Sequence, residues 1–91
     1  MSHLSNDSQK LVARIRRIAG QVAAIERSVL ANAPCSETLH LAAAIRGAVG
    51  GLMDELFEEH LLAHVAAPEL SPAERAAGAD ELLTVLGRHF R

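Results

Sequence analysis

Residues 10–29 read KLVARIRRIAGQVAAIERSV and carry a clear helical pattern. Apolar residues recur there at alternating steps of four and three, and this spacing places them along one side of an α-helix. The residues of this apolar row are Leu11, Ile15, Ile18, Val22, Ile25 and Val29. The pattern predicts a first helix over about residues 7–30.

A second helical pattern follows a break at residues 31–34. Pro34 ends the first pattern because proline lacks an amide donor and disfavours helical geometry in the residue before it. From about residue 35 to residue 65, two neighbouring rows of residues at helical spacing predict one long helix. The rows are Ile45, Val49, Leu52 and Leu56, and Met53, Phe57, His60 and His64. Three glycines lie in its middle, Gly47, Gly50 and Gly51. They indicate either the close approach of another helix or a local kink.

A third helix is predicted over about residues 72–90. Pro68 follows the second pattern, and the sequence Ser71-Pro72-Ala73-Glu74 has the form of a capping box with proline at the first helical position. The third helix has an apolar face of its own, made of Leu82, Leu83, Leu86 and Phe90.

Composition supports a single all-α domain over residues 1–91. Hydrophobic residues make up 49% of the chain but aromatic residues only 2%, so any core must be built from aliphatic side chains, as in helical bundles. A subunit of this size with long apolar faces is expected to form an oligomer. We find no signal-peptide pattern and no run of ~18 apolar residues, which predicts a cytoplasmic protein without a membrane partner.

A polar, basic stripe runs beside the apolar row of the first helix. Its members are Lys10, Arg14, Arg17 and Gln21. Their spacing of four, three and four puts them on one face, whereas Arg16 points elsewhere. The stripe is either a DNA-binding surface or an ordinary solvated face. The sequence has neither a helix-turn-helix pattern nor a zinc-finger spacing. If the protein binds DNA, it must therefore do so through a less common kind of surface.

His60 and His64 are candidate metal ligands because a spacing of four puts both rings on the same side of a helix. Cys35, the only cysteine, would add a soft thiolate ligand. A helix rises 1.5 Å per residue, so Cys35 and His60 lie ~37 Å apart, and a shared site requires a second chain running antiparallel. The alternatives are two surface histidines and an apolar filler cysteine.

The N-terminus could add further nitrogen ligands. Removal of Met1 before the small Ser2 would free an α-amine next to the imidazole of His3. The alternative is an N-terminal tail without a ligand role. His40 and His89 have no partner at ligand spacing, and we assign them no site.

These motifs together resemble the CsoR/RcnR/FrmR family of repressors. The resemblance rests on LVARIRRIAGQV at residues 11–22, Pro34-Cys35, AIRGAVGGLM at residues 44–53, and His60 and His64. It covers nearly the whole chain. It implies that the second helices of two chains pair antiparallel, that dimers form homotetramers, and that the first helices bind DNA. The DNA contacts map onto Lys10, Arg14, Arg16, Arg17 and Gln21, and the sensor positions onto His3, Cys35, His60 and His64.

The resemblance also favours one kind of effector. Copper(I) and persulfide sensors of the family use two cysteines, and this chain has one. Formaldehyde sensors typically have proline after the initiating methionine and glutamate where this chain has His64. Ser2, His3 and His64 match the nickel/cobalt-sensing, RcnR-like branch instead. One thiolate, three imidazoles and an amine suit nickel(II) or cobalt(II), with zinc(II) as the chemical competitor. The chain departs from the family pattern at two positions. Gly50 stands where a polar residue is more usual, and Ala63 stands where some nickel/cobalt sensors carry an acidic residue. The change at Ala63 leaves the coordination number of the metal open.

We therefore expect a repressor that binds operator DNA without metal and is released by nickel(II) or cobalt(II), derepressing a metal efflux gene. Within the family, the alternative is a formaldehyde sensor that uses Cys35 and the N-terminal amine. Outside it, the alternative is a helical interaction module with no DNA role. We do not expect an enzyme, because Cys35 has no histidine base placed for it within its own chain.

Overall fold

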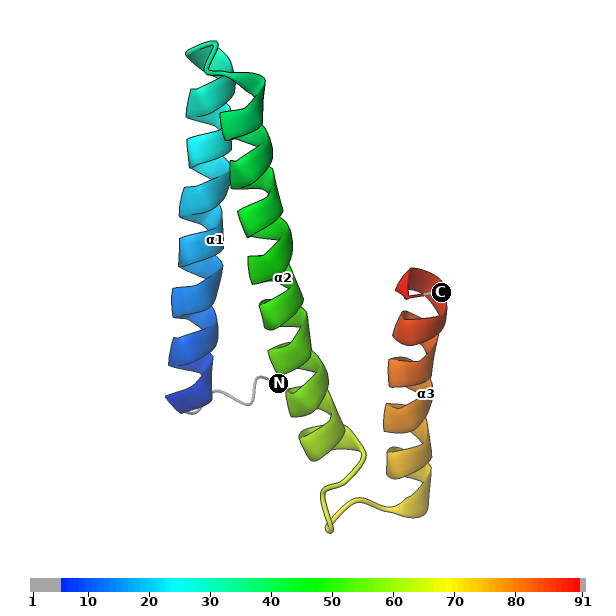
Figure 1. Ribbon diagram of the computed structural model, residues 1–91. Helices are drawn as coiled ribbons and strands as arrows, with labels where there is room; N and C mark the ends of the chain where they lie inside the picture. The colour runs from blue at the N-terminus through cyan, green and yellow to red at the C-terminus, as the bar shows by residue number, and fades with distance from the viewer. Residues whose placement is uncertain (1–5, 91) are drawn as a thin grey trace. The chain divides into compact units, whose positions relative to one another are not determined.

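The computed structural model describes residues 6–90, which form three α-helices and no strand (Figure 1). The helices are α1 (Asn6–Leu30), α2 (Cys35–His64) and α3 (Pro72–His89). The predicted all-α class is confirmed, and each helix begins and ends within one residue of its predicted bounds. None of the helices in the described range is both long and apolar enough to cross a membrane.

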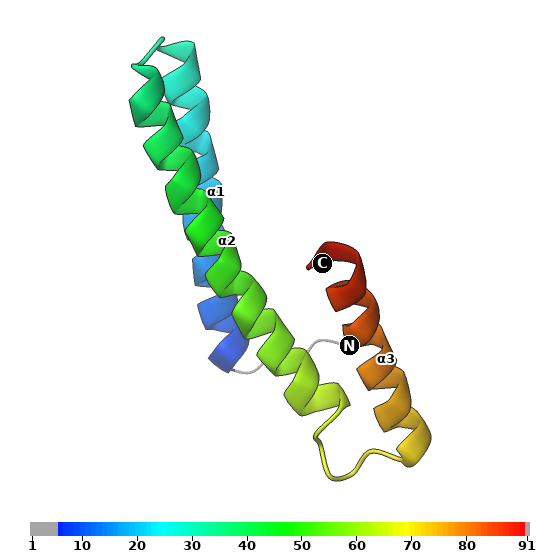
Figure 2. The same cartoon turned by 45° about the vertical axis from the view of Figure 1, so that its right-hand side comes forward.

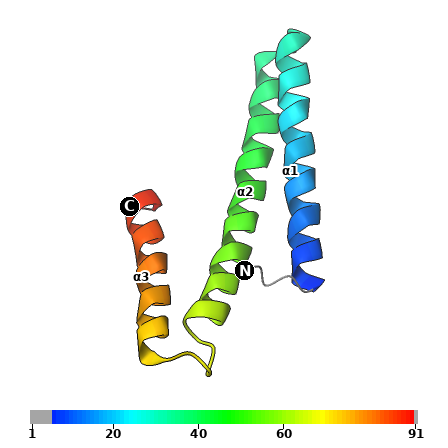
Figure 3. The same ribbon diagram turned by 180° about the vertical axis from the view of Figure 1, so that it is seen from behind.

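The chain divides into two compact units, one ending at Met53 and the other beginning at Asp54. In the first unit, α1 and the N-terminal part of α2 run side by side in opposite directions, as views from the front and from behind both show (Figures 1 and 3). The turn between them depends on Asn32, whose φ of 53° is left-handed, a conformation that asparagine tolerates better than most residues. The Ala33 amide donates to the Ser28 carbonyl at 3.0 Å, which satisfies the end of α1.

The α1 helix does not place its whole apolar row against α2. Leu11, Ile18 and Ile25 are half-buried. Ile15, Val22 and Val29, by contrast, stay 49%, 53% and 59% exposed. The half-buried face also includes Arg14 and Gln21 from the basic stripe, so α2 lies over the boundary between the two rows. Within one chain, α2 therefore covers only part of the apolar row of α1. The exposed half is left for another surface to cover.

A single chain lacks a closed core. Among residues 8–90, no hydrophobic side chain is fully buried. The expected close approach at the central glycines occurs only at Gly51, where an added Cβ would lie 2.6 Å from Nη1 of Arg14. Around Gly47 and Gly50, an added Cβ would meet no atom of the described chain within 4 Å. The contact at Gly51 is made by a side chain rather than by a helix backbone, so the predicted helix approach is not seen within one chain.

The second unit contains the last turns of α2 and the whole of α3. Between them the chain reverses, so that α3 runs in the opposite sense to the end of α2 (Figure 2). The predicted capping box is confirmed: the Glu74 amide donates to Ser71 Oγ at 3.1 Å, and the Ser71 amide donates to Glu74 Oε1 at 2.8 Å. The pKa of Glu74 is lowered, first by the Ser71 amide and then by its hydroxyl, because both stabilise the carboxylate. Phe57 and Phe90 pack edge to face with ring centroids 5.5 Å apart.

Candidate metal site and basic surface

His60 and His64 lie together on the last turns of α2. Their ring centroids are 5.0 Å apart, with planes inclined by 43°. The structure therefore brings together the two imidazoles that the sequence spacing placed on one face. His64 is exposed and His60 is half-buried, so the pair lies where α2 meets solvent.

One ring nitrogen of His60 contacts α3. His60 Nε2 lies 2.9 Å from the carbonyl oxygen of Gly78. A carbonyl oxygen can only accept, so Nε2 carries the hydrogen and donates it. In a neutral imidazole the other nitrogen, Nδ1, then holds the lone pair that a metal ion needs.

Gly78 is the residue of this site that the sequence analysis missed. It is buried, and its carbonyl faces a predicted ligand. The available signal was a glycine among alanines in Ala76-Ala77-Gly78-Ala79, because a glycine inside a helix is destabilising unless a close contact requires it.

The other predicted ligands do not join the histidine pair within the described chain. Cys35 is exposed and is the first residue of α2, whereas His64 is the last. At 1.5 Å per residue, Cys35 and His60 lie ~37 Å apart along that helix. His3 and the amine of Ser2 lie outside the described residues. Over the described range, no group of three or more His, Cys, Asp or Glu side chains is placed to hold a metal ion.

The histidine pair nonetheless fits a transition metal by its chemistry. Two imidazoles one helical turn apart, one of them oriented by a backbone carbonyl, are typical of a site for nickel, cobalt or zinc. Two ligands leave the coordination of such an ion incomplete. The site needs further donors from outside these two turns, and Cys35 of a second chain is one that the sequence offers.

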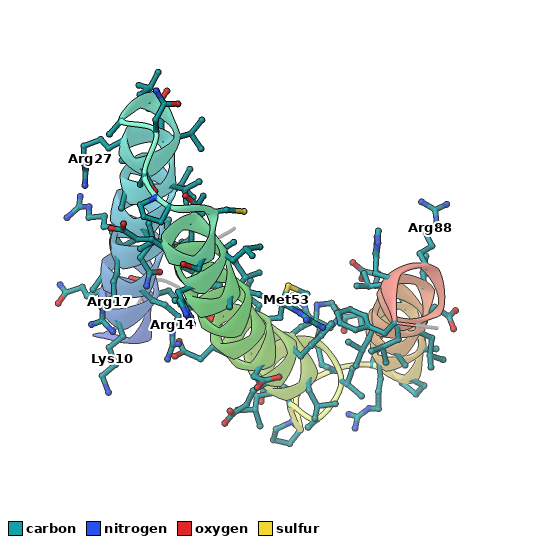
Figure 4. All side chains as sticks on the ribbon, turned by 45° about the horizontal axis from the view of Figure 1, so that its top comes forward. Lys10, Arg14, Arg17, Arg27, Met53 and Arg88 are labelled. Atoms are coloured by element: carbon teal, nitrogen blue, oxygen red, sulfur yellow. The ribbon has the colours of Figure 1, made fainter. Side chains whose placement is uncertain are left out.

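The basic stripe of α1 is partly exposed. Within the stripe, Lys10 and Arg17 are exposed, whereas Arg14 and Gln21 are half-buried; Arg16, which lies on another side of α1, is exposed as well. Figure 4 shows Lys10 and Arg17 extending outward from α1, with Arg14 on the side of α1 next to α2. The exposed cations of the stripe are therefore Lys10 and Arg17, and Arg16 adds a third exposed charge on another side of the same helix.

Comparison with known proteins shows the family to which this chain belongs. The family model described as metal-sensitive transcriptional repressor matches residues 7–88. This chain belongs to the metal-sensitive transcriptional repressor family. The family consists of regulators rather than enzymes, so the expectation of a non-enzymatic protein is confirmed. The CsoR/RcnR/FrmR resemblance is confirmed as well.

Relatives of this repressor match it over its full length. The transcriptional repressor RcnR of Salmonella typhimurium is 40% identical, and a protein described only as uncharacterized, in the bioA 5' region of Serratia marcescens, is 43% identical; both alignments cover 100% of each chain. Among solved structures, a variant of the formaldehyde-responsive regulator FrmR from Salmonella enterica serovar Typhimurium is similar, with a TM-score of 0.89 and 40% identity. The match covers 94% of this chain and 97% of that one.

Proposed function

We propose that this repressor binds operator DNA in its metal-free form and is released by nickel(II) or cobalt(II), derepressing a metal efflux gene. The observation that carries the proposal is the placement of His60 beside His64, in a chain of the metal-sensitive repressor family. Full-length similarity to RcnR supports the proposal. His64 supports it as well, because the family resemblance associates a histidine at this position with the nickel/cobalt-sensing, RcnR-like branch.

The proposed sensor is shared between chains of a homodimer, and dimers pair into a homotetramer. Cys35 of one chain and the two imidazoles of another would bind one ion, with His3 and the Ser2 amine as further ligands. A bound divalent ion would supply the free energy that draws these donors into one arrangement. The exposed Ile15, Val22 and Val29 support an assembly, because they form an apolar row that one chain leaves uncovered.

The proposed DNA surface is the basic face of α1. Lys10 and Arg17 are exposed there and would contact phosphates, with Arg14 and Gln21 beside them at the α2 border. Arg16, exposed on another side of α1, joins the proposed contacts by the family resemblance. The site of metal binding and the site of DNA binding then lie on different helices. Release of DNA requires only that the metal-bound arrangement of the chains holds DNA less well than the metal-free one.

A second candidate effector is formaldehyde, favoured by the similarity to a formaldehyde-responsive regulator. In this mechanism the Cys35 thiol and the N-terminal amine would add to formaldehyde and become joined by a methylene bridge, with loss of one water. His64 distinguishes the candidates, because the resemblance places glutamate there in formaldehyde sensors. The similar solved structure is itself a variant in which a histidine replaces a glutamate.

The decisive experiment compares effectors on one DNA probe. A duplex selected by the metal-free protein from a random pool is labelled, and its binding is followed while nickel, cobalt, zinc, copper(I) or formaldehyde is added. We expect nickel or cobalt to release the wild-type protein and to leave His64→Ala bound. The matched control is His40→Ala, which removes an exposed histidine of the same helix and should respond normally. Release by formaldehyde alone, retained in His64→Ala, would contradict the proposal.

A further inference from the structure

The α3 helix contacts the histidine pair through one residue, Gly78. Gly78 is the only buried residue of α3 in the described part of the chain. It brings its carbonyl to His60 Nε2 at 2.9 Å and lies against the backbone of His64. A single residue of α3 thus contacts both candidate ligands of α2.

The space around Gly78 explains why a glycine stands there. A Cβ built at this position would collide with the His64 carbonyl oxygen, and would lie 2.8 Å from the carbonyl carbon and 3.0 Å from Cβ of His64. Two of these three atoms are backbone and cannot move away by a change of rotamer. Any larger residue would therefore push α3 away from the end of α2 and lengthen the hydrogen bond to His60.

We propose that Gly78 is a positioning residue of the metal sensor: its carbonyl holds the His60 ring with Nε2–H toward α3 and Nδ1 as the ligand atom. This inference rests on the proposed metal-sensing role. A backbone carbonyl that accepts from the non-ligating nitrogen fixes the tautomer and orientation of a metal-binding imidazole. Gly78 also makes α3 part of the sensor, because displacement of α3 would release the ring.

The first test needs no metal. Long-range proton–nitrogen spectra of the full-length, metal-free protein labelled in its histidines report which ring nitrogen carries the proton, and His60→Ala identifies the His60 signals. At a pH where imidazoles are neutral, we expect His60 to be protonated at Nε2 and unprotonated at Nδ1. Protonation at Nδ1 would overturn the proposal, whatever the protein does with metals or DNA.

The second test measures metal affinity. Cobalt(II) titration of Gly78→Ala should show binding weaker by about 10- to 100-fold, the usual effect of losing such a supporting contact. The control is Gly20→Ala, which adds the same methyl group to α1 where nothing lies within 4 Å, and which should bind cobalt as the wild type does. Wild-type affinity in Gly78→Ala would overturn the proposal.

The two tests separate this inference from the proposed function. If the wild-type protein binds no cobalt, the proposed function fails, while the tautomer of His60 still decides whether Gly78 holds the ring. If Gly78→Ala does not fold, the spectrum of the wild-type protein alone gives the answer.

Discussion

The α1 surface and the last turns of α2 both carry ionisable side chains, but these side chains differ in exposure and in their contacts. On α1, Lys10, Arg16 and Arg17 are exposed cations. At the end of α2, His60 is half-buried, 5.0 Å from the ring of its neighbour and hydrogen-bonded to a backbone carbonyl of α3. Binding to phosphates depends mainly on how many charges face the DNA, whereas a metal site depends on the position of each donor atom. Substitutions should therefore have graded effects on α1 and all-or-none effects at the sensor.

The largest expected effect is the loss of the sensor when any essential donor is removed. Cys35→Ala should abolish the thiolate-to-cobalt charge-transfer absorption, because no other cysteine is present to replace the thiolate. The variant should still bind DNA but should no longer respond to metal. The control is Ser36→Ala, which changes the next exposed residue of α2 and leaves every proposed ligand in place.

Mixing chains tests whether the site is shared. A double variant with His60→Ala and His64→Ala should lack the cobalt–thiolate signal, as Cys35→Ala does. In a heterodimer of the two variants, one site has both the Cys35 thiolate and the two imidazoles, and the other site has neither. Refolded mixtures should regain part of the signal. If mixtures shown by mass to contain heterodimers recover nothing, all ligands belong to one chain and the antiparallel arrangement is wrong.

An intermediate, graded effect is expected on α1. Lys10→Ala and Arg17→Ala should each weaken DNA binding and should each reduce the log–log salt slope by about 1, because each removes one phosphate contact. Cobalt affinity should stay unchanged. Arg27→Ala is the matched control, since it removes an exposed charge of the same helix outside the basic stripe. An unaltered salt slope in the double variant would exclude this face as the DNA surface.

A smaller effect is expected where the α1 surface meets α2. Gly51→Ala would place a methyl group 2.6 Å from Nη1 of Arg14, and this flexible side chain must move. We expect DNA affinity to fall by less than about tenfold, since one contact is weakened rather than lost. Gly50→Ala, with nothing within 4 Å, is the control. Equal effects of the two substitutions in a binding titration would argue against a role for the Arg14 position.

The sequence predicted local structure better than it predicted contacts between helices. Helix bounds, the capping box at Ser71 and the side-by-side placement of His60 and His64 all follow from spacing within one segment, and all are confirmed. The division of the α1 apolar row could not be predicted, because it depends on the angle from which α2 approaches. The Gly78 contact was missed for the same reason: it joins residues of two helices, and no periodicity within either one encodes it.

The ligand set, the effector and the assembly could not be predicted from spacing within one segment, because each depends on contacts that one chain does not make by itself. His3 and Ser2 lie outside the described residues, and the proposed site requires a second chain. The family assignment supports a metal ion as the effector.

If metal binding releases DNA, the protein couples the two ligands, and this coupling can be measured from either side. Cobalt affinity is measured by its absorption with and without the selected duplex, at one fixed salt concentration. Because coupling is reciprocal, DNA must weaken cobalt binding by the same factor by which cobalt weakens DNA binding, and we expect that factor to be about 5- to 150-fold. Equal cobalt affinities in the presence and absence of DNA would mean that the metal is structural and would contradict the account.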